Sequence, residues 1–198
     1  MLDWLKNIKK EYPEFWKAYL GKFENKSNRY VIFSTETTGT NLKDDVILSI
    51  GAIGVIDDKI KVSDNFETVI FQYKFLHDHG LSNDSIINSK LTKMTEDQAI
   101  QSFIEYIGNA TLVGHQIQFD ILMINEVLEK MGCGKIKNEA LDIEIMHQKL
   151  HDLANKPIRW EDLSKHYKIN VSENNTVLDE AYSMALVFLK LKTRLGIK

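Results

Sequence analysis

The sequence predicts an α/β domain with a mixed central sheet, in which three antiparallel strands are followed by parallel strands and helices flank the sheet. Three apolar runs, at residues 29–39, 46–56 and 59–71, follow one another so closely that they should pair antiparallel. From residue 96 onward, segments with a helical period alternate with short apolar runs, a pattern typical of strands joined by helices.

Composition limits the classes of protein that this chain can belong to. Its 198 residues, 43% of them hydrophobic, suit one sizeable domain. A net charge of −3 argues against non-specific coating of nucleic acid but leaves room for a groove that binds one strand end. Cys133 is the only cysteine, so we expect a buried thiol and a cytoplasmic protein. No uncharged apolar run approaches the roughly 18 residues that span a bilayer, so we expect no membrane partner.

Residues 1–28 are predicted to form a helical N-terminal extension, and residues 29–198 the main domain. Pro13 interrupts the helical pattern and can open a second helix. The apolar face of this second helix consists of Trp16, Tyr19, Leu20 and Phe23. Two interpretations stay open: the extension packs on the domain, or residues 1–24 offer an aromatic surface to a partner.

The main domain is organised around its first strand. Residues 30–33 are aromatic and β-branched, and small hydroxylated residues follow around a single acid, Glu36. Open α/β sheets place their chemistry at the carboxyl end of such strands. Asp57 and Asp58 separate the second and third apolar runs and predict a tight hairpin turn.

The rest of the chain alternates between helices and short strands, after a stretch at residues 72–95 that shows no clear pattern. That stretch contains His77 and His79, whose spacing resembles a metal-binding pair but lacks a nearby cysteine or acid cluster. The expected elements are a helix at 96–107, a strand at 111–114, a helix at 119–131, a strand leading into a helix at 141–153, and helices at 160–167 and 177–195.

Acids lie at three of these element boundaries. They are Glu36 after the first strand, Asp120 near the start of a helix, and the pair Asp179 and Glu180 at the start of the last helix. An acid in a first helical turn is explained by the helix dipole alone. Together, however, these acids are suited to a hard divalent cation, which prefers several carboxylate oxygens.

Three motifs resemble those of the DEDDh 3′–5′ exonucleases, the family of the epsilon proofreading subunit of bacterial DNA polymerase III. VIFSTETTG resembles the first motif, LVGHQIQFDILMINEVL the second and NTVLDEAYSMALVFLKL the third, over residues 29–191. The resemblance implies an RNase H-like fold, two Mg²⁺ or Mn²⁺ ions held by four acids, and a histidine as general base. It also implies release of nucleoside monophosphates from a 3′ end.

The chain departs from the family pattern at three catalytic positions. Glu36 and Asp120 match two of the four acids, but Ser34 stands where the family has the first acid. With the third motif anchored on its alanine, Asn175 occupies the general-base position and Glu180 the final acid position. The resemblance therefore implies a metal site of Glu36, Asp120 and Glu180 that holds one ion or none.

The third motif also allows a second register, with Asn174 at the histidine position and Asp179 as the acid. Neither register recovers a histidine. The candidates for a substitute base are His115, His147 and His166, although His115 matches a family histidine and is expected to give structural support.

Substrate contacts are carried over from the turn that receives the 3′-terminal nucleotide in the family. The matching residues are Thr37, Thr38 and Gly39, with His115 nearby in the second motif. Glycine permits close backbone approach, and hydroxyl groups can donate to phosphate or sugar.

Three hypotheses follow for the function. The leading one is an exonuclease-family protein of DNA replication or repair that binds a nucleotide or a nucleic-acid 3′ end, expected to be single-stranded DNA, with hydrolysis weakened or lost. The second is an active metal-dependent exonuclease with a rearranged site. The third is a protein-interaction module that contacts a replication or repair partner through residues 1–24.

Overall fold

A computed structural model of the chain describes residues 11–72, 91–153, 156–171 and 176–197. At its centre lies a six-stranded sheet in the order β4-β3-β2-β1-β5-β6. The strands are β1 (Arg29–Thr37), β2 (Ile47–Ile56), β3 (Lys59–Ile70), β4 (Lys93–Met94), β5 (Thr111–Gly114) and β6 (Ala140–Asp142). β1, β2 and β3 pair antiparallel in turn, whereas β5 pairs parallel with β1 and β6 parallel with β5. The predicted mixed sheet is confirmed.

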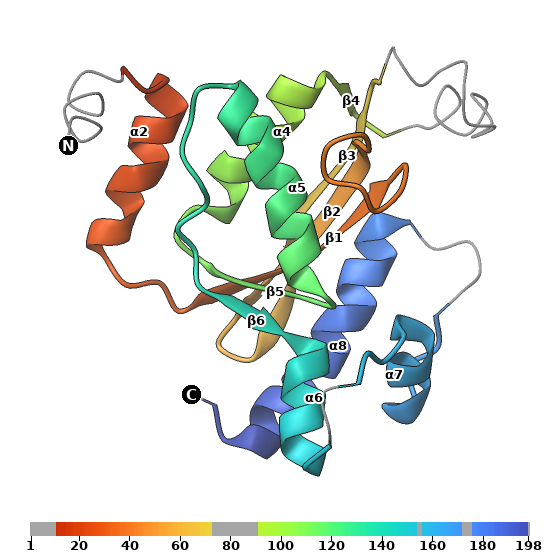
Figure 1. Ribbon diagram of the computed structural model, residues 1–198. Helices are drawn as coiled ribbons and strands as arrows, with labels where there is room; N and C mark the ends of the chain where they lie inside the picture. The colour runs from red at the N-terminus through yellow and green to blue at the C-terminus, as the bar shows by residue number, and fades with distance from the viewer. Residues whose placement is uncertain (1–10, 73–90, 154–155, 172–175, 198) are drawn as a thin grey trace, which may run out of the picture.

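Helices cover both faces of the sheet (Figure 1). They are α2 (Glu14–Gly21), the 3₁₀ helix η2 (Lys22–Glu24), α4 (Glu96–Ile107), α5 (Ile117–Lys130), α6 (Ile143–His151), α7 (Trp160–His166) and α8 (Val177–Leu195). One hydrophobic cluster contains residues of α2, α4 and α5, and a second contains residues of α6, α7 and α8. The sheet therefore forms the middle layer between two groups of helices.

The alternation of side chains along β1 explains why there are two cores. Phe33 points to one face and packs on Phe103 of α4, with ring centroids 5.2 Å apart. Tyr30 points to the other face and packs on Phe188 of α8 at 5.0 Å. Because successive side chains of a strand point to opposite faces, the even-numbered residues of β1 face α8. Ser34 and Glu36 are on that face.

The described part of the N-terminal extension, residues 11–28, packs on the domain. Trp16 and Tyr19 of α2 are each only 1% exposed. The Tyr19 hydroxyl donates to the side chain of Asn138 and accepts from the backbone amide of Lys137, both at 2.7 Å. These two rings therefore face the domain and not a partner, while a partner surface elsewhere on residues 1–24 stays a prediction. Cys133 is buried, as predicted.

The observed elements differ from the predicted ones at a few boundaries. β1 continues to Thr37, so Ser34 and Glu36 lie within the strand and not after it. α5 begins two residues before the predicted position, and the two-residue strand β4 was not predicted. His77 and His79 lie outside the described residues. Within the described part of the chain, no helix is long and apolar enough to cross a membrane.

Candidate active site

The predicted site residues gather at the carboxyl end of β1, between the first turns of α5 and α8. Asp120 lies in the first turn of α5 and Glu180 in the first turn of α8. Ser34, Thr35 and Glu36 are consecutive residues of β1. The three segments are far apart in sequence, and the sheet with its two helix layers brings them together.

Ser34 and Glu180 are in direct contact. The Ser34 hydroxyl donates to Oε2 of Glu180 at 3.0 Å, and Ser34 is 7% exposed. Ser34 pairs with Gly51 of β2, where a Cβ atom would lie 2.4 Å from the backbone nitrogen of Leu178. Only glycine allows the first turn of α8 to approach the sheet this closely. Gly51 thus positions Glu180 beside Ser34.

Asp120 is held from the opposite side of β1. Its Oδ1 accepts a hydrogen bond from the hydroxyl of Thr35. Burial raises the pKa of Asp120 to about 7, with smaller contributions from the charges of Glu180 and Asp142, while the Thr35 hydrogen bond opposes the shift. Thr35 was not among the predicted site residues, although its position between two of them was a usable signal.

Glu36 completes the group of acids. Its Oε2 accepts from the hydroxyl of Ser49 on β2 at 3.0 Å. Burial raises the pKa of Glu180, the Ser34 hydrogen bond and the charge of His115 oppose the shift, and the negative charges of Glu161 and Glu36 add to it. Mutual repulsion of this kind requires the carboxylates to lie within electrostatic range of one another. Sequence alone could not identify Ser49, because the register of β1 against β2 decides which residue faces Glu36.

The two candidate acids of α8 have different surroundings. Asp179 accepts from the backbone amide of Thr176 at 3.1 Å, while its own amide donates to the Thr176 hydroxyl, which makes a capping box. Glu180 instead faces Ser34. This geometry favours the register that uses Glu180. Asn174 and Asn175, the two candidates for the general-base position, lie outside the described residues.

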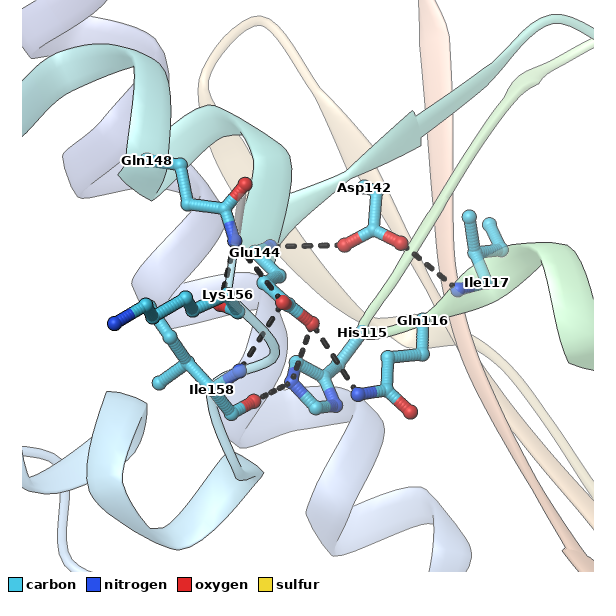
Figure 2. Close-up of polar contacts among 8 residues, drawn as sticks. All are labelled: His115, Gln116, Ile117, Asp142, Glu144, Gln148, Lys156 and Ile158. Carbon is cyan, nitrogen blue, oxygen red and sulfur yellow. Dashed lines mark hydrogen bonds and ion pairs between the residues drawn. The ribbon is translucent and has the colours of Figure 1, made fainter. Parts of the chain in front are cut away.

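A polar network supports the turn between β5 and α5 (Figure 2). Asp142 accepts from the backbone amides of Ile117 at 3.2 Å and Glu144 at 2.9 Å. Oε2 of Glu144 accepts from the side chain of Gln116 at 3.3 Å and lies 3.6 Å from Nε2 of His115. Gln116 has a left-handed backbone with φ of 52°, which is uncommon for a residue other than glycine, and the network holds it in place. No sequence signal pointed to Glu144.

His115 is bound within this network. Its Nε2 lies 2.7 Å from the backbone oxygen of Ile158, and the backbone amide of Ile158 donates to Oε1 of Glu144 at 3.1 Å. The ring thus joins the β5–α5 turn to the segment that precedes α7. This arrangement supports a structural role for His115.

The turn after β1 is stabilised by its own hydroxyl groups. Thr37 donates to the backbone oxygen of Gly39 at 2.8 Å, and Thr38 donates to Oδ1 of Asp45 at 2.7 Å. A Cβ atom on Gly39 would lie 2.5 Å from Oδ2 of Asp45, so the absence of a side chain lets Asp45 close the turn. The part that Thr37, Thr38 and Gly39 play in binding a 3′ end stays a prediction.

The donor set of Glu36, Asp120 and Glu180 fits a hard divalent cation. Within the described ranges, no lysine or arginine forms an ion pair with any of the three carboxylates. Oxygen ligands of this kind suit Mg²⁺ or Mn²⁺. The fourth ligand position of the family pattern, however, holds the neutral hydroxyl of Ser34.

The other histidines considered as substitute bases form a separate cluster. His147 and His166 have ring centroids 4.8 Å apart, and both contact Tyr167. Among the described residues, no hydrogen bond or ion pair joins either ring to the three carboxylates.

A protein-family model described as "Exonuclease" matches residues 31–175 of the chain. The chain is 29% identical over 187 residues to the PolC-type DNA polymerase III of Clostridium perfringens, covering 89% of this chain and 12% of that protein. It is 27% identical over 176 residues to the PolC-type enzyme of Staphylococcus haemolyticus, covering 84% and 11%. The chain thus spans about one eighth of these relatives.

Solved structures show the same fold at low sequence identity. E. coli exonuclease I in complex with a dT13 oligonucleotide superposes with a TM-score of 0.67 at 14% identity, covering 86% of this chain and 42% of that one. Exonuclease X in complex with 5′-overhanging duplex DNA gives a TM-score of 0.53 at 19% identity, covering 85% and 94%. Both likenesses concern the fold, which is the RNase H-like fold of the DEDD exonucleases.

Proposed function

Because this chain belongs to the exonuclease family, we propose that it binds the 3′ end of single-stranded DNA, or a nucleoside monophosphate, and that its phosphodiester hydrolysis is weakened or lost. The family assignment rests on the match over residues 31–175. The proposed loss of activity rests on the chain's own site residues.

The contact between Ser34 and Glu180 carries the proposal. The family pattern places a carboxylate at position 34, where it would bridge two metal ions. Here a hydroxyl occupies that position and donates to the acid of α8 at 3.0 Å. The carboxylates available to cations thus fall from four to three, and the ligand at position 34 would be a neutral hydroxyl. A site of this kind suits one divalent ion better than two.

Glu36, Asp120 and Glu180 are the residues that would hold that ion, Mg²⁺ or Mn²⁺. Members of this family generally depend on divalent metals. A bound ion would polarise the phosphodiester and lower the pKa of a bound water. The chain's own residues orient the ligands: Ser49 holds Glu36, and Thr35 holds Asp120.

The residue at the general-base position is the second reason to expect slow hydrolysis. In the favoured register, Asn175 stands where the family has histidine, and an amide does not accept a proton at neutral pH. A positioned general base typically contributes about 10²–10⁴-fold to the rate. Hydrolysis without it is expected to be slow even with a metal bound.

Similarity to named proteins supports DNA as the substrate class. The PolC-type relatives are DNA polymerases, and exonuclease I was solved with a dT13 oligonucleotide. We therefore infer a role in DNA replication or repair, in the cytoplasm, where Cys133 stays a reduced thiol.

The test is release of nucleoside monophosphates from a single-stranded oligonucleotide with Mg²⁺ or Mn²⁺, assayed beside an active family member. We expect a rate lower by at least about 100-fold, because a hydroxyl replaces the carboxylate at position 34 and an amide replaces the general base. Turnover equal to that of the active enzyme would refute the proposal.

A second candidate is an active exonuclease with a rearranged site, and one observation favours it. The longer side chain of Glu180 brings its Oε2 to Ser34, so a carboxylate oxygen lies beside the position of the missing acid. Under this alternative, Glu36→Ala abolishes a measurable activity. Equal rates for the wild type and Glu36→Ala would exclude it.

A further inference from the structure

Three histidines outside the carboxylate site form a compact cluster. They are His147 and His151 of α6 and His166 of α7, and one ligand atom from each lies within 4.8 Å of the other two. The ring centroids are 4.6 Å apart for His147 and His151, 4.8 Å for His147 and His166, and 5.1 Å for His151 and His166. His147 is buried, whereas the other two rings are exposed.

The secondary structure explains how the three rings meet. His147 and His151 are four residues apart on α6, so they lie on one face of the helix, one turn apart. His166 is the last residue of α7. The contacts among the rings therefore join the final turns of two short helices.

The Tyr167 hydroxyl orients the buried ring. Nδ1 of His147 lies 2.8 Å from this hydroxyl. A ring that donates its Nδ1–H to a fixed partner keeps a lone pair on Nε2, which is how proteins prepare histidines for metal binding.

We propose that His147, His151 and His166 bind a borderline transition-metal ion of the Zn²⁺ type at a site separate from the three carboxylates. Imidazole ligands suit Zn²⁺, Ni²⁺ and Cu²⁺, whereas Mg²⁺ and Mn²⁺ favour oxygen. Three nitrogens at about 2.05 Å from a tetrahedral Zn²⁺ lie about 3.3 Å apart. The exposed rings of His151 and His166 can make this adjustment by side-chain rotation, and water completes the coordination.

The consequence of binding is a link between α6 and α7. The first turn of α7 carries Glu161, whose charge acts on Glu180, and Ile158 just before α7 contacts His115. A metal at the last turn of α7 therefore fixes a helix whose other end borders the candidate active site.

The experiment is a calorimetric titration of the untagged, chelator-treated full chain with Zn²⁺ in the presence of excess Mg²⁺. We expect one Zn²⁺ ion to bind per chain. His151→Ala and His166→Ala should each lower the Zn²⁺ affinity by at least about 10–100-fold, which is the range known for the loss of a residue that only hydrogen-bonds to a metal ligand. Both side chains are exposed, so the variants should fold, and circular dichroism checks this. Co²⁺ gives an independent readout through its visible absorption when bound to nitrogen ligands.

Two control variants identify the site that binds. The double variant His77→Ala/His79→Ala removes the other closely spaced histidine pair, and Glu36→Gln weakens the carboxylate site. We expect both to retain the Zn²⁺ equivalent. The proposal is overturned when no Zn²⁺ equivalent binds, when His151→Ala and His166→Ala bind Zn²⁺ as the wild type does, or when a control variant loses it instead.

Discussion

Ser34 and Glu180 depart from the family pattern in opposite senses, because one side chain is shorter than the expected aspartate and the other is longer. The extra methylene of Glu180 spans the space that the short side chain of Ser34 leaves, and a 3.0 Å hydrogen bond joins them. The two changes thus compensate each other in packing. They do not compensate in charge, since one carboxylate is missing.

The protonation of Asp120 makes stability depend on pH at the level of a single residue. Burial raises its pKa to about 7, whereas the unfolded chain releases this proton near pH 4. Between these values the folded state binds more protons, so the free energy of unfolding falls as pH rises from about 4 to about 7. With chelator present, Asp120→Asn should be more stable than the wild type at pH 8, by up to about 4 kcal/mol.

Urea unfolding of both proteins at pH 5 and pH 8 measures this difference. Glu129→Gln, an exposed change on the same helix, serves as the control and should follow the wild type. If the free energy of unfolding changes equally between pH 5 and pH 8 in the wild type and in Asp120→Asn, Asp120 ionises normally and the prediction is wrong.

Glu144, in contrast to Asp120, is a residue whose carboxylate is needed by its surroundings. Its two carboxylate oxygens accept from Gln116, Gln148 and the backbone amide of Ile158. Glu144→Gln turns an amide NH₂ toward donors in either orientation, so we expect a loss of about 1–3 kcal/mol in the free energy of unfolding.

The matched change Glu14→Gln affects a side chain that is 89% exposed and should shift stability by less than about 0.5 kcal/mol. Urea midpoints compare the two variants. Equal midpoints for Glu144→Gln and Glu14→Gln would contradict the role of the network.

At the scale of elements, the contact between β2 and α8 decides where the last acid lies. Gly51 leaves no side chain between the sheet and Leu178. Gly51→Ala places a Cβ against backbone atoms that cannot rotate away, so α8 must shift. We expect a loss of about 1–3 kcal/mol in stability, with weaker Mn²⁺ binding because Glu180 moves with the helix.

Gly21→Ala is the control, because a Cβ atom there meets nothing within 4 Å. It lies at the end of α2 and should be neutral or stabilising by up to about 1 kcal/mol. The same stability change in both variants would indicate that Gly51 has no packing role.

The limits of α8 could be predicted from sequence, whereas those of β1 could not. Thr176 and Gly196 cap α8 at its two ends, and both signals are local. β1 continues through Thr37 because its polar residues pair with β2, and that pairing is not visible in sequence. β4 has two residues, too few for any pattern.

The sequence motifs predicted Glu36, Asp120 and Glu180 as the acids of the site, but not the residues that hydrogen-bond to them. Ser49 reaches Glu36 through strand register, and Glu144 reaches His115 across two segments far apart in the chain. Such partners depend on tertiary packing. A local sequence pattern can therefore predict the acidic residues, but not the residues that hydrogen-bond to them in the folded domain.

At the scale of the molecule, both helix layers contribute side chains to the carboxyl end of β1. α5 brings Asp120 from one face of β1, and α8 brings Glu180 from the other. β1 separates these layers and supplies Ser34 and Glu36 at its carboxyl end. The fold thus brings the predicted acids together, and the proposed loss of hydrolysis rests on Ser34 in place of a fourth acid.

The most direct test of this account restores the missing groups and measures catalysis. The triple variant Ser34→Asp/Asn175→His/Glu180→Asp is compared with the wild type in the release of nucleoside monophosphates from single-stranded DNA with Mn²⁺. We expect the restored chain to be faster by at least about 100-fold, since it regains a metal ligand and a general base. A wild-type rate equal to that of the restored chain, and abolished by Glu36→Ala, would contradict the account.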